Sequence, residues 1–208
     1  MGCKAVTDKQ GALPRIYLIR HGETAWSLSG QHTGRTDLPL TEHGEKDARK
    51  LSERLSAVSF SRVFSSPLLR ARRTSELAGF GERAGIEADA VEWDYGDYEG
   101  QSPADIRKQR PDWNIFLDGC PHGESPEQVS GRADQLIGRL RNLDGNVALF
   151  SHGQFGRVLG ARWIGLPVHQ AQHLLLRTAS VSILGFEHDR AEVPAIIVWN
   201  AVADGIFD

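Results

Sequence analysis

Short apolar runs recur along the chain and alternate with longer stretches in which apolar residues return every three or four positions. A strand that is buried on both faces of a sheet has a nearly continuous apolar run. A helix that packs against a sheet instead has the spacing of three and four. The runs that predict strands are residues 15–19, 62–66, 146–150, 180–186 and 195–200.

The helical stretches begin with residues that cap helices. Thr41 precedes a stretch in which Ala48, Leu51, Leu55 and Val58 share one face. Ser-Pro pairs begin three further helices, because proline at the first helical position loses no hydrogen bond. These pairs predict a helix that Ser66 caps, one over 102–109 and one over 125–143, and a further helix is predicted over 154–164.

The alternation of strands and helices predicts an α/β fold, a three-layer α/β/α domain with a mostly parallel central sheet. Residues 1–13 are predicted to be a flexible N-terminal tail, and 14–208 to form a single domain. A stretch rich in Gly, Pro and Asp, at about 94–125, is predicted to be an excursion that covers one face of the sheet.

Composition argues against several classes of protein, among them nucleic-acid binders, disulfide-rich proteins and membrane proteins. A net charge of −3 over 208 residues lacks the basic excess of a nucleic-acid binder. Cys3 and Cys120 are too few for a disulfide framework or a metal cluster. No apolar run is long enough to span a membrane, and the N-terminus lacks the apolar segment of a signal peptide. We therefore expect a cytoplasmic protein with no membrane or nucleic-acid partner, and the sequence leaves the oligomeric state open, a homo-oligomer included.

Three predicted strands end in residues that suit an anion. The first ends in "RHGET", the second in "SSPLLRARRT" and the third in "SHGQ". Ligands of open α/β sheets bind at the carboxyl ends of the strands, where helix N-termini also offer free N–H groups. Arg20, His21, Arg70 and His152 are therefore expected to surround one phosphate-sized pocket. Arg20 should make His21 harder to protonate, because like charges repel.

The motifs "RHGET", "SSPLLRARRT", "EWDYG" and "SHG", in that order, resemble those of the histidine phosphatase superfamily, in its phosphoglycerate mutase-like branch. The resemblance covers about residues 15–200. It implies a phosphoglycerate mutase-like fold in which His21 is the nucleophile and becomes a phosphohistidine. It also implies that Arg20, Arg70 and His152 neutralise the phosphoryl group and that Glu92 is the proton donor.

Other residues of the same motifs and loops are expected to contact the substrate. Thr24 should donate a hydrogen bond to the phosphate, and His32 should bind a second phosphate or a sugar hydroxyl unless it is an exposed loop histidine. Ser27 stands where many members of the family have Asn. The full set assigned to substrate binding is Gly22, Thr24, Ser27, His32, Thr33, Gly34, Tyr95 and Gly153. For the proton donor, Asp94, Asp97 and Glu99 remain alternatives to Glu92.

The chemistry requires no metal and no cofactor. Phosphoryl transfer spreads negative charge over oxygens that two arginines and a second histidine can neutralise, and a carboxylic acid can protonate the leaving oxygen. The short segment between the acid motif and the second histidine motif favours hydrolysis over isomerisation. The expected substrate is a small phosphomonoester, most of all a sugar phosphate, as in the sedoheptulose bisphosphatase-like group. The alternatives are a phosphoglycerate mutase, a phosphoprotein phosphatase and a non-catalytic binding module on the same scaffold.

Overall fold

The computed structural model describes residues 12–202, and its centre is a six-stranded sheet with the order β3-β2-β4-β1-β5-β6. The first four strands in this order run parallel, and β5 and β6 are antiparallel to their neighbours. All five predicted strands are present, and a short edge strand joins them. The strands are β1 (Arg15–Arg20), β2 (Phe60–Ser65), β3 (Ala84–Ile86), β4 (Asn146–Ser151), β5 (Val181–Phe186) and β6 (Pro194–Ala201).

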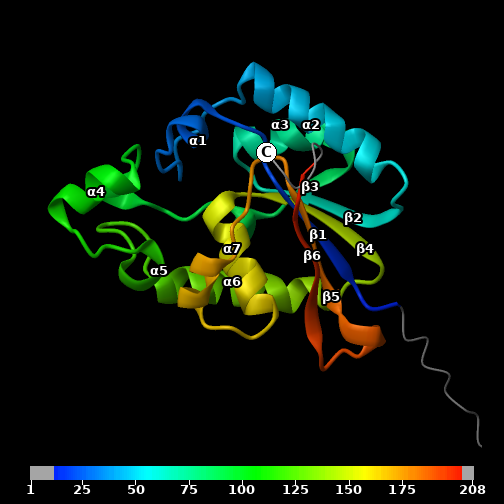
Figure 1. The fold of residues 1–208 in the computed structure, drawn as a ribbon. Helices are drawn as coiled ribbons and strands as arrows, with labels where there is room; N and C mark the ends of the chain where they lie inside the picture. Colours follow the sequence, from blue (N-terminus) through cyan, green and yellow to red (C-terminus); the bar gives the residue numbers. More distant parts are fainter. Residues whose placement is uncertain (1–11, 203–208) are drawn as a thin grey trace, which may run out of the picture.

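Helices cover both faces of the sheet, as the predicted three-layer fold requires. The helices α2 (Glu42–Leu55) and α3 (Leu69–Leu77) lie on one face, and α6 (Pro126–Leu140) and α7 (Gly153–Trp163) on the other (Figure 1). Two apolar cores result, one on each side of the sheet. Strand β1 serves both cores, because Ile16 and Leu18 face α6 and α7 whereas Ile19 faces the other side.

The predicted caps hold for three of the helices. Thr41 accepts a hydrogen bond from Gly44 N, and Ser125 and Gln128 form a capping box at the start of α6. The third is Ser102, which caps α4 (Pro103–Gln109).

The prediction for α3 is wrong at its start. This helix begins at Leu69 rather than at Pro67, and Ser66 does not cap it. The Asp37 carboxylate accepts from Leu69 N at 2.7 Å instead, so the cap comes from a distant loop. The Ser66 hydroxyl takes part in a different contact, with His152.

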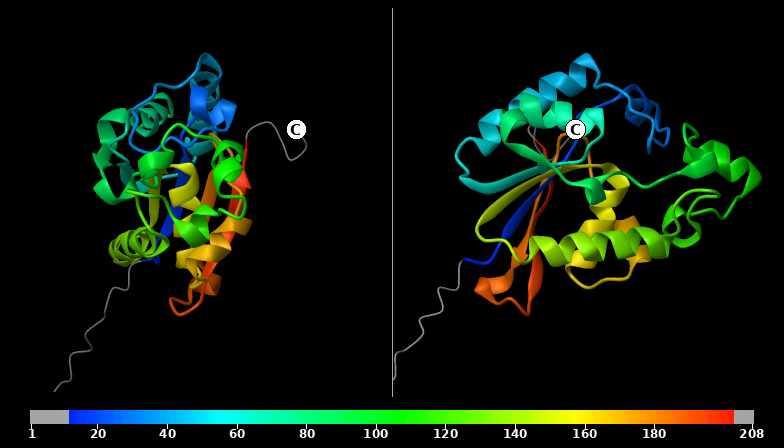
Figure 2. Two further views of the ribbon diagram at one scale, coloured as in Figure 1. Left: turned by 90° about the vertical axis from the view of Figure 1, so that its left-hand side faces the viewer. Right: turned by 180° about the vertical axis from the view of Figure 1, so that it is seen from behind.

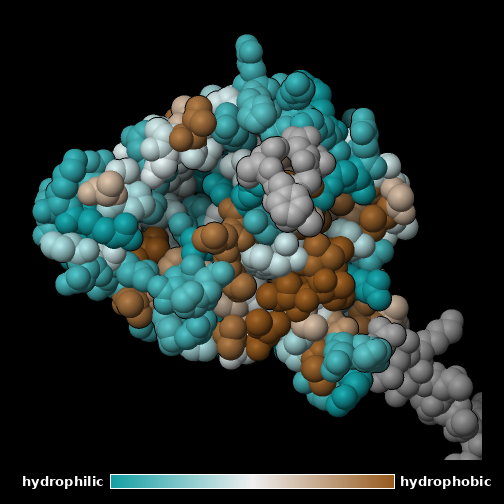
Figure 3. Space-filling model, viewed as in Figure 1, coloured by the Kyte–Doolittle hydropathy of each residue, from teal (hydrophilic) through white to brown (hydrophobic). Residues whose placement is uncertain are grey.

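Part of the chain projects beyond the sheet. The short helix α1 (Ala25–Ser29) and the helices α4 and α5 (Ile115–Asp118) lie to one side of the layered body (Figure 2). Gln31 Nε2 donates to Gly100 O at 2.7 Å and joins the segment after α1 to the segment before α4. The surface is hollowed between this projection and the rest of the molecule (Figure 3).

The sequence predicts a flexible tail over residues 1–13 and no segment that spans a membrane. Of the predicted tail, residues 1–11 lie outside the described residues. No helix within residues 12–202 is long and apolar enough to cross a bilayer.

Candidate active site

The register of three parallel strands brings their carboxyl ends to one edge of the sheet. Arg20 of β1 is paired with Ser151 of β4, and Ser65 of β2 is paired with Phe150 of β4. The residues that follow these strands therefore emerge side by side. His21 N donates to Ser151 O at 3.0 Å, and Ser66 N donates to Phe150 O at 2.9 Å.

The imidazole of His21 is held in one tautomer. Its Nδ1 lies 2.7 Å from Gly22 O. A carbonyl oxygen only accepts, so Nδ1 carries the hydrogen and Nε2 keeps a free lone pair. The side chain is 3% exposed and lines a cavity, so this free lone pair belongs to a group suited to nucleophilic attack.

Burial and two cations lower the pKa of His21 well below its usual value of 6.5. Burial is the largest cause, the Arg70 guanidinium comes next and the Arg20 guanidinium follows, while the bond to Gly22 O opposes them. The sequence argument from the neighbouring Arg20 has the correct sign. It misses the larger effects of burial and of Arg70, which only the fold brings near.

His152 stands behind His21 and is bonded on both ring nitrogens. The two ring centroids are 5.2 Å apart. Arg70 Nε donates to His152 Nδ1 at 3.2 Å, so Nε2 carries the hydrogen and donates to Ser66 Oγ at 2.7 Å. Burial, followed by the charge of Arg70, lowers the pKa of His152 well below 6.5. The structure thus brings together the two histidines that the sequence placed 131 positions apart.

The two arginines of the predicted site differ in their partners. The Arg70 guanidinium donates to Thr36 O, Thr33 O and Gly34 O besides His152. The Arg20 guanidinium donates to Leu176 O at 2.5 Å, and its buried Nε has no partner among the described residues. Arg20 lines the cavity, whereas Arg70 does not.

The Glu92 carboxylate lies at the N-terminus of α7, on the same cavity as Arg20 and His21. Its Oε1 accepts from Trp93 N at 2.9 Å and Phe155 N at 2.8 Å, and its Oε2 accepts from Gln154 N at 3.0 Å. The side chain is 7% exposed and lines the same cavity as Arg20 and His21.

The three alternative acids are bound elsewhere. Asp94 pairs with Arg35, and the exposed Asp97 pairs with His122. Glu99 accepts from Gly34 N and Thr36 N. None of the three lines the cavity that Glu92 shares with His21 and Arg20, so the geometry favours Glu92 as the acid.

The cavity has a volume of about 190 Å³. Eight of the predicted site residues line it, and they come from the end of β1, from α1 and the loop after it, from the segment around Glu92 and from the start of α7. The lining residues are Arg20, His21, Ser27, Gly30, Gln31, His32, Thr33, Glu92, Tyr95, Pro103, Gly153, Gln154, Arg157 and Leu176.

Three predicted substrate-binding residues do not line the cavity. Thr24 is fully buried, and its hydroxyl caps α1 by accepting from Ser27 N. Gly22 donates its N–H to Thr74 Oγ1, and a Cβ there would lie 2.5 Å from Gly44 O. Gly34 is as tightly enclosed, because a Cβ would lie 2.6 Å from a Glu99 carboxylate oxygen. The two glycines permit close packing around the site, and Thr24 shapes the loop.

His32 is buried in an aromatic setting, which rules out the exposed alternative. Its ring stacks on Tyr95 with centroids 4.3 Å apart and meets the edge of Trp113. Burial, with a smaller effect from Arg107, lowers the pKa of His32 to about 4. Its Nε2 is buried without a hydrogen-bond partner among the described residues, although the side chain lines the cavity.

Sequence reasoning missed Arg157, which adds a second guanidinium to the cavity wall. Its partners are Ala171 O, Gln172 O and Gln154 Oε1, and it lies over the Phe116 ring. A signal is present in the sequence, because Arg157 lies four residues after Gly153 and therefore on the same face of α7.

Residues 12–202 contain no group of three or more His, Cys, Asp or Glu side chains that could hold a metal ion. Cys120 is buried and free, and burial raises its thiol pKa to about 12. Cys3 lies outside the described residues.

With this geometry established, comparison with known proteins identifies the family. The family model described as histidine phosphatase superfamily (branch 1) matches residues 16–200. The chain belongs to the histidine phosphatase superfamily. The resemblance inferred from four motifs is thereby confirmed, together with its phosphoglycerate mutase-like fold.

Relatives within the superfamily carry three kinds of names. An acid phosphatase of Mycobacterium tuberculosis is 42% identical over 180 residues, which are 84% of this chain and 87% of that protein. The sedoheptulose 1,7-bisphosphatase of Saccharomyces cerevisiae is 37% identical over 190 residues, 76% of this chain and 70% of that protein. A probable phosphoglycerate mutase of Photorhabdus laumondii is 32% identical over 184 residues, 84% of this chain and 86% of that protein.

A solved structure agrees with the fold over most of its length. The protein of the Mycobacterium tuberculosis open reading frame Rv3214 matches with a TM-score of 0.85 at 38% identity. The match covers 90% of this chain and 97% of that chain.

Proposed function

We propose that this protein is a metal-independent phosphatase, which hydrolyses small phosphomonoesters, chiefly sugar phosphates, through a phosphohistidine at His21. The observation that carries the proposal is the free Nε2 of His21, which faces a cavity beside the unpaired Arg20 Nε and the Glu92 carboxylate. A neutral imidazole, a guanidinium donor and a carboxyl group are the parts that phosphoryl transfer from an ester needs.

The first step transfers the phosphoryl group to the protein. His21 Nε2 attacks phosphorus, the bond from phosphorus to the ester oxygen breaks, and that oxygen takes a proton from Glu92. Arg20 binds phosphoryl oxygens, and its Nε has no hydrogen-bond partner among the described residues. Gly153, at the positive end of α7, adds a favourable dipole.

The second step releases phosphate. A water molecule attacks the phosphorus of phosphohistidine, the bond to Nε2 breaks, and the Glu92 carboxylate takes a proton from the water. Burial and the charges of Arg70 and Arg20 keep His21 neutral and ready for the next attack. The two guanidiniums supply the positive charge themselves, so the mechanism needs no metal.

The cavity supports a small substrate with hydroxyl groups. A volume of about 190 Å³ suits a sugar phosphate better than a segment of a phosphoprotein. The pKa of His32 is about 4, so its ring is neutral near pH 7. A neutral imidazole with an unpaired nitrogen suits a sugar hydroxyl better than a second phosphate. Arg157 is the cation on the cavity wall that suits the second phosphate of a bisphosphate.

A panel of metabolites tests the proposal. The purified protein, with and without a chelator, is incubated with sedoheptulose and fructose bisphosphates, smaller phosphomonoesters and 3-phosphoglycerate, and both free phosphate and isomerised product are measured. We expect phosphate release that a chelator leaves unchanged. Conversion of 3-phosphoglycerate to its isomer without phosphate release would instead support a mutase, the second candidate, which the Photorhabdus relative favours. No turnover with any compound would favour a non-catalytic binding module.

A further inference from the structure

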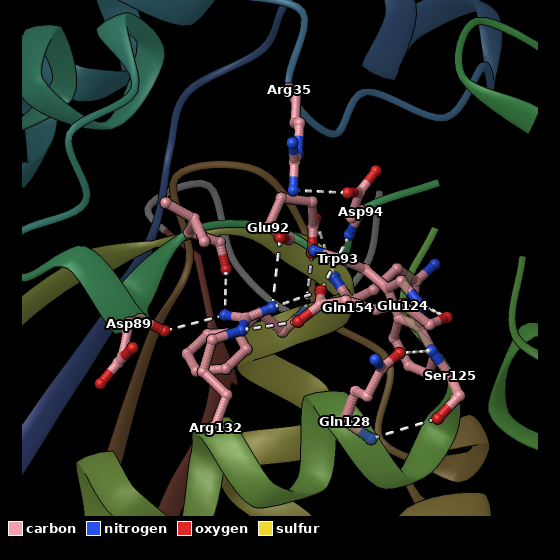
Figure 4. Close-up of polar contacts among 12 residues, drawn as sticks. Arg35, Asp89, Glu92, Trp93, Asp94, Glu124, Ser125, Gln128, Arg132 and Gln154 are labelled. Atoms are coloured by element: carbon pink, nitrogen blue, oxygen red, sulfur yellow. Dashed lines mark hydrogen bonds and ion pairs between the residues drawn. The ribbon is translucent and has the colours of Figure 1, made fainter. Parts of the chain in front are cut away.

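The segment that carries Glu92 runs without a strand partner. Residues 91–94 belong to no helix or strand and lie between the sheet and α6. Buried backbone groups need hydrogen-bond partners wherever regular structure does not supply them. Here side chains supply them, and Figure 4 shows that two charged residues provide most of these bonds.

Arg132 of α6 binds the carbonyl side of this segment. Its Nη1 donates to Asp89 O and Val91 O, each at 2.8 Å, and its Nη2 donates to Glu92 O at 3.3 Å. The guanidinium also lies 4.3 Å from the centre of the Phe155 ring. Phe155 is the residue whose N–H binds Glu92 Oε1, so Arg132 contacts both the backbone of Glu92 and one of the residues that hold its carboxylate.

Glu124 binds the other side of the segment and joins it to Arg132. Its carboxylate accepts from Arg132 Nε at 2.8 Å and Nη2 at 2.7 Å, in a two-pronged pair. The same carboxylate accepts from Asp94 N at 2.9 Å, and Glu124 O accepts from Trp93 Nε1 at 2.9 Å. The two side chains are only 13% and 20% exposed, so most of this network is shielded from water.

We propose that Arg132 and Glu124 form a clasp that positions Glu92 for proton transfer to the leaving oxygen. The inference rests on the proposed function. Arg132 uses its five N–H donors on Glu124 and on the carbonyls around Glu92, and it does not line the cavity. It is therefore a positioning residue that acts through Glu92 and touches no substrate.

Loss of the clasp is expected to affect alkyl and aryl phosphate esters differently. A displaced acid matters most when the leaving group is an alkoxide, which must take a proton as it leaves, and least when it is an aryl oxide. A shift of about 1 Å in a catalytic group can cost about 100-fold. Loss of the clasp is expected to lower kcat/KM for glycerol phosphate by about 100-fold and to leave kcat/KM for an aryl phosphate within about fivefold.

The test compares wild type, Glu92→Gln, Arg132→Met and the double variant on glycerol phosphate and on p-nitrophenyl phosphate. If Arg132 acts through Glu92, both single variants lose activity selectively on the alkyl ester. Arg132→Met then adds little further loss on that ester once Glu92 is already Gln. Arg162→Met is the control, because Arg162 of α7 also forms a two-pronged pair with a carboxylate, that of Asp134 in α6, and it should retain the wild-type ratio of the two activities.

Equal losses on both esters in Arg132→Met, or losses that multiply in the double variant, would overturn the clasp. Thermal unfolding shows whether Arg132→Met is folded. If it is not, Arg132→Lys decides, because it keeps the charge and loses the planar fork; an alkyl-selective loss of about tenfold is expected, and an equal loss overturns the proposal. If Glu92→Gln itself shows no dependence on the leaving group, the acid assignment of the proposed function fails, and the clasp fails with it.

Discussion

Arg20, at the end of β1, and Arg70, in the first turn of α3, meet at one site but have different hydrogen-bond partners. Arg70 donates to His152 and to the carbonyls of Thr33, Gly34 and Thr36. Arg20 donates to Leu176 O, and its Nε is left without a partner among the described residues. Burial lowers the pKa of both guanidiniums, and the Glu92 carboxylate opposes this in both.

This difference assigns the two arginines to different roles, one in binding the phosphoryl group and the other in stabilising the structure of the site. The donors of Arg70 are occupied by the loop that follows α1 and by the second histidine, so the residue holds the site together. The donors of Arg20 are mostly free beside the cavity, so the residue is available to bind the phosphoryl group. Two arginines that the motifs treat alike should therefore respond differently to substitution, one in activity and the other in stability.

The comparison of Arg20 with Arg70 bears on catalysis only if His21, which lies near both, is the nucleophile. His21→Ala removes the atom that attacks phosphorus and is expected to lower kcat by about 10⁴-fold or more. Release of free phosphate from p-nitrophenyl phosphate measures kcat. Phosphohistidine is labile in acid, so protein that has briefly reacted with a labelled phosphate ester should keep the label when it is denatured in alkali and lose it when it is denatured in acid. Activity that survives in His21→Ala would show that the two arginines surround some other group.

Arg20→Met tests the binding role. It removes donors that are free for the substrate, and we expect kcat/KM to fall by about 100-fold to 1000-fold. Stability should change by less than about 1 kcal/mol, because the variant loses one hydrogen bond and also removes a desolvated charge. Steady-state kinetics and urea unfolding measure the two effects. A fall in stability larger than the one in Arg70→Met would reverse the comparison.

Arg70→Met tests the supporting role. It leaves His152 Nδ1 and three carbonyls without their donor, and buried groups left unpaired cost free energy. We expect the free energy of unfolding to fall by about 2–4 kcal/mol, together with a loss of activity. Urea unfolding beside Arg20→Met gives the comparison directly, and equal stabilities of the two variants would contradict it.

The smallest expected effect is on the pKa of His21, and the direction of the shift can be stated for each arginine variant. Removing a neighbouring cation makes protonation easier, so both variants should raise the pKa of His21, Arg70→Met more than Arg20→Met. In the wild type this pKa lies well below 6.5 in the folded state, so the unfolded chain binds more protons and stability falls as the pH drops below about 6.5. Imidazole signals followed by NMR against pH measure the shift, and a lower pKa in either variant would contradict the prediction.

Several elements show where sequence reasoning succeeds and where it stops. The helix after Thr41 is predicted with its cap, because capping and apolar spacing are local. The start of α3 is predicted wrongly, because its cap comes from Asp37, which lies far away in the sequence. Thr24 is misplaced for a similar reason, since its hydroxyl serves α1 rather than the cavity. Arg157 is missed because no motif contains it.

The sequence by itself determined five of the six strands, the covering helices and the family, and it predicted His21 as the nucleophile. These depend on apolar periodicity and on short motifs, which are properties of neighbouring residues. Only the tertiary structure decided that Arg20 is free while Arg70 is occupied, that His32 is buried against Tyr95, and that Arg132 holds the segment of Glu92. Hydrogen bonding and desolvation depend on groups that meet across the fold, and a linear pattern does not record which groups those are.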